Sequence, residues 1–156
     1  MSAMRLLAIA ALALTALLAM SRPAAAILCF FNSTVGVNFG AYNVFNPAPI
    51  DSTGSLTYTC VSVGGATITI DLSKGSAPSY FPRQLRKGTQ ALSYNLYREA
   101  ARLSVWGNGT GGTSRYGPIT PPNNKSVTVT IYGRLPARQN VSAGAYTDTI
   151  TATLNF

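Results

Sequence analysis

The sequence predicts an all-β protein in which two antiparallel sheets pack as a sandwich. Apolar and polar residues alternate with a period of two in several short runs, which is the pattern of a strand with one buried face. These runs are rich in Thr, Val, Ile and Tyr, residues that favour strands. Turn residues such as Gly64-Gly65 and Asn108-Gly109 separate the runs, and no run after the N-terminal segment keeps a helical period.

Six or seven short strands are expected from this pattern. In one of them Ile68, Ile70 and Leu72 alternate with polar residues, and the other runs repeat that arrangement. A single helical turn is expected over residues 99–103, and the Gly-, Pro- and Asn-rich stretch 107–124 is interpreted as a long loop. The expected strands lie, in chain order, at residues 35–39, 56–60, 68–72, 92–96, 127–131 and 149–156.

The N-terminal segment, residues 1–26, has the order of a secretory signal peptide. Arg5 supplies the basic start, residues 6–20 form an apolar run, Pro23 breaks it, and small residues lead to a cleavage site after Ala26. The alternative is a membrane anchor, but the run falls short of the ~20 apolar residues that cross a bilayer. We therefore expect one exported domain, residues 27–156, which does not span a membrane after cleavage.

Two cysteines, Cys29 and Cys60, are the only thiols in the chain. Export brings them into an oxidising compartment, where we expect them to form a disulfide. Closing a loop of this length is worth about 3–4 kcal/mol in the loop-entropy account. A free reactive cysteine is the alternative, but the sequence offers no base to activate it.

The composition leaves little room for catalysis, a metal or a cofactor. The chain has 12 Lys and Arg, 4 Asp and Glu and no His, for a net charge of +8. Without His there is no Ser-His-Asp or Cys-His triad, and two thiolates alone cannot complete a four-coordinate zinc site. The Gly-rich stretch 107–112 lacks the Lys-Ser/Thr pair of a phosphate-binding loop, so it is interpreted as a turn. Asp148, one of the four carboxylates, is expected to serve a turn or a cap.

Basic residues bracket the expected strand at 92–96. We interpret them as a solvated positive surface, with binding to anionic polysaccharide or lipid headgroups as the alternative. Nucleic acid is the least favoured partner because the protein is exported. The residues are Arg83, Arg86, Lys87, Arg98 and Arg102.

The C-terminal run, residues 149–156, keeps its apolar face to the end and contains no charge and no Pro. Proteins normally protect an unpaired sheet edge with a charge, a Pro or a bulge. An unprotected edge indicates that another chain pairs with it by strand addition.

Several segments, taken in order, resemble the spore coat protein U domain. The resemblance runs from about Cys29 to Phe156, and its first motif contains Val37-Asn38-Phe39-Gly40. The segments that carry it are residues 37–45, 50–60, 91–97, 105–112, 132–136 and 143–150.

This resemblance implies an incomplete immunoglobulin-like sandwich that lacks its last strand. The family includes secreted, non-enzymatic pilus subunits of the archaic chaperone–usher class. It implies a periplasmic chaperone that first supplies the missing strand, an outer-membrane usher, and other pilus subunits whose N-terminal extensions later replace the chaperone strand. The protein would pass through the periplasm to the cell surface or an extracellular fibre. The edge that pairs with a chaperone or donor strand would carry Ile150, Ala152, Leu154 and Phe156.

One feature departs from a polymerising subunit. After cleavage only Ile27 and Leu28 precede Cys29, whereas even a short strand needs ~4–5 residues. We therefore expect a subunit that accepts a strand but does not donate one, at a fibre end or in an accessory position. The competing interpretation is a monomeric secreted module that binds carbohydrate or another surface through exposed aromatic residues, namely Tyr80, Phe81, Trp106 and Tyr116.

Overall fold

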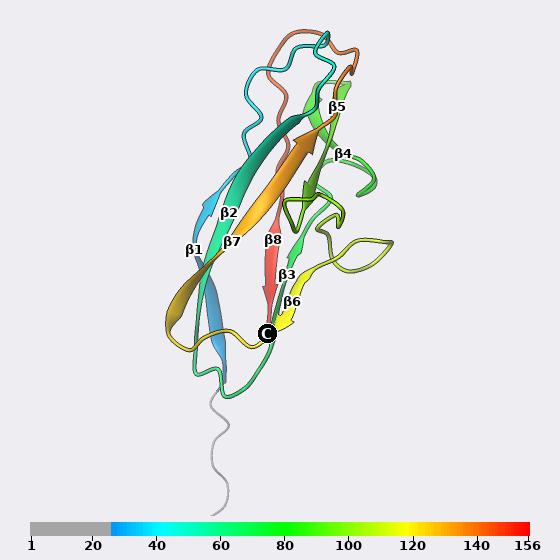
Figure 1. Ribbon diagram of the computed structural model, residues 1–156. Coiled ribbons are helices and arrows are strands. Elements are labelled where there is room, and N and C mark those ends of the chain that lie inside the picture. Colours follow the sequence, from blue (N-terminus) through cyan, green and yellow to red (C-terminus); the bar gives the residue numbers. More distant parts are fainter. Residues whose placement is uncertain (1–25) are drawn as a thin grey trace, which may run out of the picture.

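The structure is a computed structural model that describes residues 26–156 (Figure 1). The signal peptide expected at residues 1–26 lies, apart from Ala26, outside the described residues and stays a prediction. Within residues 26–156 there is no helix long and apolar enough to cross a membrane. The strands are β1 (Leu28–Val35), β2 (Ile50–Val61), β3 (Ile68–Leu72), β4 (Arg83–Lys87), β5 (Gln90–Tyr97), β6 (Tyr116–Ile119), β7 (Lys125–Leu135) and β8 (Ala152–Asn155).

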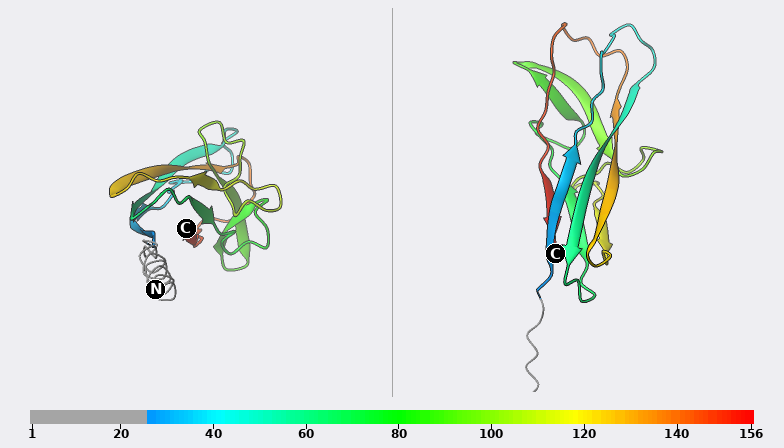
Figure 2. Two further views of the ribbon diagram at one scale, coloured as in Figure 1. Left: turned by 90° about the horizontal axis from the view of Figure 1, so that it is seen from below. Right: turned by 90° about the vertical axis from the view of Figure 1, so that its left-hand side faces the viewer.

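The strands form two sheets that face each other. The larger sheet has five strands in the order β1-β2-β7-β5-β4, and the smaller has three in the order β6-β3-β8. Every pair of neighbouring strands is antiparallel, and the view from below in Figure 2 shows the two layers. The predicted all-β sandwich is confirmed, and it is consistent with an incomplete immunoglobulin-like fold.

The core lies between the sheets, and strand alternation fills it. Strands β2 and β7 pair along almost their whole length, from Ile50 opposite Leu135 to Thr59 opposite Ser126. Alternate residues of each strand point inward, so the apolar half of each run is removed from water. The core side chains include Leu56, Tyr58, Ile68, Ile70, Leu72, Leu92, Tyr94, Leu96, Trp106, Ile131 and Leu135.

The predicted disulfide is confirmed. Cys29 of β1 lies directly opposite Cys60 of β2 in the strand register, and their Cα atoms are 4.1 Å apart. Both are buried. The bond therefore ties the edge strand β1 to the long central pair of strands.

The expected strand at residues 35–39 is wrong in its position. The strand is β1, which begins at Leu28 and ends at Val35, and the chain then leaves the sheet edge. Val37 and Phe39 pass over Gly133 of β7, where an added Cβ would lie 2.6 Å from Val37 Cγ1 and 2.9 Å from Phe39 Cζ. Because a side chain at position 133 would occupy this space, the glycine allows both residues to pack against the core.

Two short edge strands account for the eight strands where six or seven were expected. Strand β4 consists mainly of polar residues, and β6 lies inside the stretch 107–124 interpreted as a loop. Strand β6 contains Pro118, which an edge strand tolerates because it need not donate to a second neighbour. The helical turn expected at residues 99–103 is instead a hydrogen-bonded turn from Arg102 N to Glu99 O (3.0 Å), with Glu99 Oε1 accepting from Leu103 N (2.7 Å).

Arg83 does not belong to a solvated positive surface, because it is completely buried. Its Nε and Nη2 atoms donate to the Ser73 carbonyl oxygen (3.0 and 2.8 Å), Nη1 donates to Asn95 Oδ1 (2.8 Å), and Nη2 donates to the Trp106 carbonyl oxygen (2.6 Å). Burial lowers the pKa of this guanidinium. The side chain therefore acts as an internal cross-link between the end of β3 in the smaller sheet and β5 in the larger one.

Candidate functional site

The segment that leads into β8 crosses from the larger sheet to the smaller one. Thr147 forms two backbone hydrogen bonds with Arg86 of β4, at 2.7 and 3.1 Å, and so extends the free edge of the larger sheet. A few residues later, β8 pairs with β3 of the smaller sheet, from Leu72 opposite Ala152 to Thr69 opposite Asn155. The crossing segment therefore links the edge of the larger sheet to β8 of the smaller one.

Strands β1 and β8 are both edge strands. Within residues 26–156, β1 pairs only with β2 and β8 pairs only with β3. Figure 2 shows the two strands, β1 in blue and β8 in red, lying near each other without a strand between them. Each therefore presents a row of unpaired backbone N–H and C=O groups along one side.

An apolar groove, which we call the edge groove, runs along the space between these two edges. Its lower part, beside β1 and β8, has a volume of about 330 Å³, and its upper part has a volume of about 810 Å³. The upper walls are residues 37–44, which follow β1, and residues 141–148, which precede β8. Side chains lining the lower part include Phe31, Val35, Leu56, Leu72, Tyr94, Leu96, Ile131, Ile150 and Ala152.

Side-chain hydrogen bonds hold the upper walls in place. Tyr42 Oη donates to the Pro136 carbonyl oxygen (3.2 Å) and accepts from Gln139 N (2.6 Å). The Gln139 amide in turn bonds both backbone groups of Ser93 in β5, with Ser93 N donating to Oε1 (2.7 Å) and Nε2 donating to Ser93 O (2.8 Å). The walls are thus fixed by amide side chains in place of a strand ladder.

On the other wall, the side-chain amide of Gln90 holds residues 142–146 in place. Its Oε1 atom accepts from Ser142 N (3.1 Å), Ser142 Oγ (2.7 Å) and Tyr146 Oη (2.6 Å). Lys87 adds contacts to Ser142 Oγ and to the Ala143 carbonyl oxygen. These bonds hold residues 142–146 beside the upper part of the groove.

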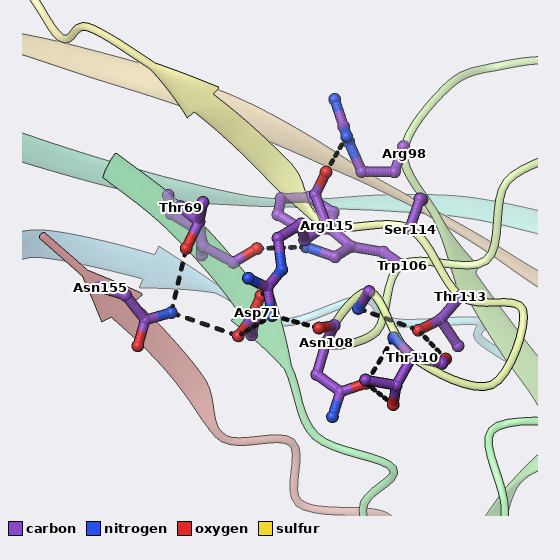
Figure 3. A network of polar contacts seen from close by, with 12 residues as sticks. Thr69, Asp71, Arg98, Trp106, Asn108, Thr110, Thr113, Ser114, Arg115 and Asn155 are labelled. Atoms are coloured by element: carbon purple, nitrogen blue, oxygen red, sulfur yellow. Dashed lines mark hydrogen bonds and ion pairs between the residues drawn. The ribbon is translucent and has the colours of Figure 1, made fainter. Parts of the chain in front are cut away.

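The far end of β8 is held by a polar network (Figure 3). Asn155 Nδ2 donates to Thr69 Oγ1 and Asp71 Oδ2, both at 3.2 Å. Asp71 also forms an ion pair with Arg115, with 3.1 Å between Oδ1 and Nε. Because all these bonds lie on the β3 side, they anchor β8 to β3 and leave its other edge free.

The four residues predicted for the pairing edge divide into two groups. Ile150 and Ala152 are half-buried and line the edge groove. Leu154 is half-buried, lies opposite Ile70 and packs against the core, and the side chain of Phe156 is 55% exposed beyond the end of β8. Their role in pairing stays a prediction.

Asp148, which the sequence analysis expected in a turn or cap, also lines the groove. Its Oδ1 atom accepts from Ser76 N and Thr149 N, both at 2.9 Å, and its Oδ2 atom accepts from Tyr94 Oη at 2.7 Å. Burial, reinforced by this bond, raises the pKa of Tyr94 far above its ordinary value. Gly75, with a φ of +65°, makes room for the carboxylate, because a side chain there would overlap it.

The aromatic residues proposed as a carbohydrate platform do not form one. Trp106 is completely buried, and its Nε1 donates to the Ile70 carbonyl oxygen (2.9 Å). Tyr80 and Tyr116 are half-buried, with Tyr80 against the buried Arg83, so only Phe81 is exposed, at 50%. The expectation that Trp106 is exposed is therefore wrong.

The remaining basic residues are also partly engaged in structure. The Arg98 guanidinium lies 5.9 Å from the ring centroid of Trp106, and Arg102 forms an ion pair with Asp51 at 3.2 Å. Arg134 binds the same carboxylate (2.7 Å) and holds the pKa of Asp51 below its usual value. Arg98 therefore packs on an aromatic ring, and Arg102 and Arg134 share one carboxylate within the molecule.

Comparisons with known proteins agree with this geometry. The family model of the Spore Coat Protein U domain matches residues 14–153. Protein U of Myxococcus xanthus is 35% identical over 142 residues, which cover 82% of this chain and 77% of that protein.

A solved structure shares the fold. It is a chain of the CsuC–CsuE chaperone–tip adhesion subunit pre-assembly complex from archaic chaperone–usher Csu pili of Acinetobacter baumannii. The TM-score is 0.56 at 20% identity, and the match covers 84% of this chain but only 40% of that one. The likeness therefore concerns the fold. Since the family model covers most of the sequence, the chain belongs to the Spore Coat Protein U domain family.

Proposed function

We propose that the protein is a structural, non-enzymatic subunit of a chaperone–usher pilus or a related surface coat, and that its edge groove accepts an extended strand from a partner chain. One observation carries the proposal. The apolar groove lies between two strands, β1 and β8, whose facing edges have no partner within residues 26–156. Membership of the family supports the same conclusion.

A β-strand fits the groove better than a helix or a small molecule. Its backbone would satisfy the free N–H and C=O groups of both edges, and its inward side chains would cover the apolar lining. The groove follows the wall from Phe31 to Val44, so its occupant must be an extended segment that runs along this wall. At ~25 cal/mol per Å², burying several hundred Å² of apolar surface is worth on the order of 10 kcal/mol before the cost of ordering the strand.

The partners we propose are a periplasmic chaperone, an outer-membrane usher and other pilus subunits. The chaperone would supply the first strand and shield the groove during export. Its strand would pair along β8, with Ile150 and Ala152 forming part of the covered wall and Leu154 and Phe156 continuing the edge. The final location would be the cell surface or an extracellular fibre.

We also propose that the subunit accepts a strand without donating one. With cleavage after Ala26, only Ile27 and Leu28 would precede the disulfide, and Leu28 already pairs with Val61 in the β1–β2 register. No residues would then be left to reach a neighbouring groove. This would place the subunit at a fibre end or in an accessory position.

The experiment is periplasmic production of the chain with and without its chaperone. We expect the chain to be degraded or to aggregate alone and to form a one-to-one complex with the chaperone. Ile150→Arg, which puts a charge in the groove wall, should abolish that complex, whereas Thr149→Arg, at the exposed neighbouring position, should retain it. A soluble, protease-resistant monomer that does not bind the chaperone would overturn the proposal.

A further inference from the structure

Of the residues that line the edge groove in the described chain, Asp148 alone carries a charge. It lines both the lower and the upper part, so it lies where the two parts meet. The other residues common to both parts, Val37, Phe39 and Leu85, are all apolar. A strand that fills the groove must therefore cover one carboxylate that lies among these apolar side chains.

The carboxylate has room for one more hydrogen bond. Two oxygens offer about four acceptor positions, and Ser76 N, Thr149 N and Tyr94 Oη occupy three of them. An apolar side chain placed over Asp148 would exclude water from the remaining position without offering a hydrogen bond in exchange. A hydrogen-bond donor on the incoming strand would replace that water.

The charge of Asp148 already has a counterpart within the protein. Arg83 is completely buried, and all its hydrogen-bond acceptors are neutral: two backbone carbonyls and the Asn95 amide. Burial lowers the pKa of Arg83. Tyr94, Tyr80 and, with a smaller effect, the carboxylate of Asp148 raise that pKa and so partly offset the burial. A second cation from the partner would therefore be unbalanced, and a neutral donor suits the position better.

We infer that the strand accepted by the edge groove carries Ser or Thr at the single inward position that faces Asp148, with apolar residues at the inward positions on either side. This inference rests on the proposed function and adds how the partner is recognised. Asp148 also fixes the register of the strand. Sliding the strand by two residues would put an apolar side chain on the carboxylate and bury the hydroxyl against aliphatic side chains.

The test uses synthetic peptides of about ten residues, the length of a long strand. The parent peptide has valine at every inward position and threonine or lysine at the outward ones, and each further peptide changes one inward valine to serine. The protein is refolded from denaturant with each peptide, and the dissociation constant is measured. We expect one serine peptide to bind about tenfold more tightly than the parent, and every other serine peptide to bind more weakly.

Two protein variants identify the cause. In Asp148→Asn the advantage of that serine should fall below about threefold, because a neutral acceptor bonds about half as strongly as an ionised one. Asp51→Asn, which removes a carboxylate outside the groove, should keep the full advantage. The peptide series on the unmodified protein remains a complete test if Asp148→Asn does not fold.

The outcomes separate the two proposals. If no peptide binds, the acceptor function itself is overturned. If the all-valine peptide binds most tightly, or if the serine advantage survives in Asp148→Asn, the acceptor function stands and the role of Asp148 is refuted. A lysine at the same position that binds more tightly than serine would refute the choice of a neutral donor.

Discussion

Replacing Arg83 with methionine tests whether this buried cation stabilises the contact between the two sheets. Methionine keeps much of the volume and removes every hydrogen bond. It leaves the Ser73 and Trp106 carbonyl oxygens without a donor, while Asn95 Oδ1 keeps only its bond from Leu96 N (3.0 Å). At about 1–3 kcal/mol for each orphaned group, partly offset by removal of a buried charge, we expect the free energy of unfolding to fall by about 3 kcal/mol.

The assay is urea unfolding followed by the fluorescence of Trp106, the single tryptophan of the chain. It is a direct reporter because Trp106 is completely buried and its carbonyl oxygen is one of the acceptors of Arg83. Arg86→Met on the same strand is the control, and it should change the free energy of unfolding by less than about 0.5 kcal/mol. Equal effects of the two substitutions, or a loss below about 1 kcal/mol for Arg83→Met, would refute the reasoning.

Three further predictions concern the disulfide, a glycine and the response to alkali. Cys60→Ser should lower the free energy of unfolding by about 3 kcal/mol and release one titratable thiol, whereas two free thiols in the unmodified exported protein would contradict the disulfide. Gly133→Ala, whose new methyl group would meet Val37, should cost about 2 kcal/mol in urea unfolding, and Gly36→Ala, with open space around it, should cost nearly nothing. Because the pKa of Tyr94 is raised in the folded state, the free energy of unfolding should fall as the pH rises above about 10. Tyr94→Phe should make that fall shallower, and an unchanged slope would count against a buried neutral phenol.

The parts of the fold that the sequence predicted are those where local alternation matches the sheet. Strand β3 spans residues 68–72 as expected, because Ile68, Ile70 and Leu72 all face the core. The start of β1 was missed because a bulge between Phe31 and Ser33 shifts the register. The bulge interrupts the period of two, which is the signal that sequence analysis uses.

Strand β4 shows a second reason for failure. Its inward positions include Arg83, so a buried guanidinium stands where an apolar residue would have revealed the strand. Arginine is rarely buried without a carboxylate partner, and its acceptors here come from three distant segments. The local sequence around Arg83 therefore does not predict its burial. The same is true of Trp106, whose burial depends on contact with the smaller sheet.

The unequal size of the two sheets explains why the groove exists and why the sequence predicted only half of it. The alternation of residues 149–156 and the absence of charge there pointed to the free edge of β8. The opposite wall, residues 37–44, is not part of a strand and has no backbone hydrogen-bond ladder. Its position depends on Tyr42 and Gln139, which bond to residues far away in the chain. Walls held by a few side-chain amides can adjust to an incoming strand without breaking any backbone pairing between strands. The acceptor role that we propose for the groove would use this property, because the site would be open before the partner strand binds and would close around that strand afterwards.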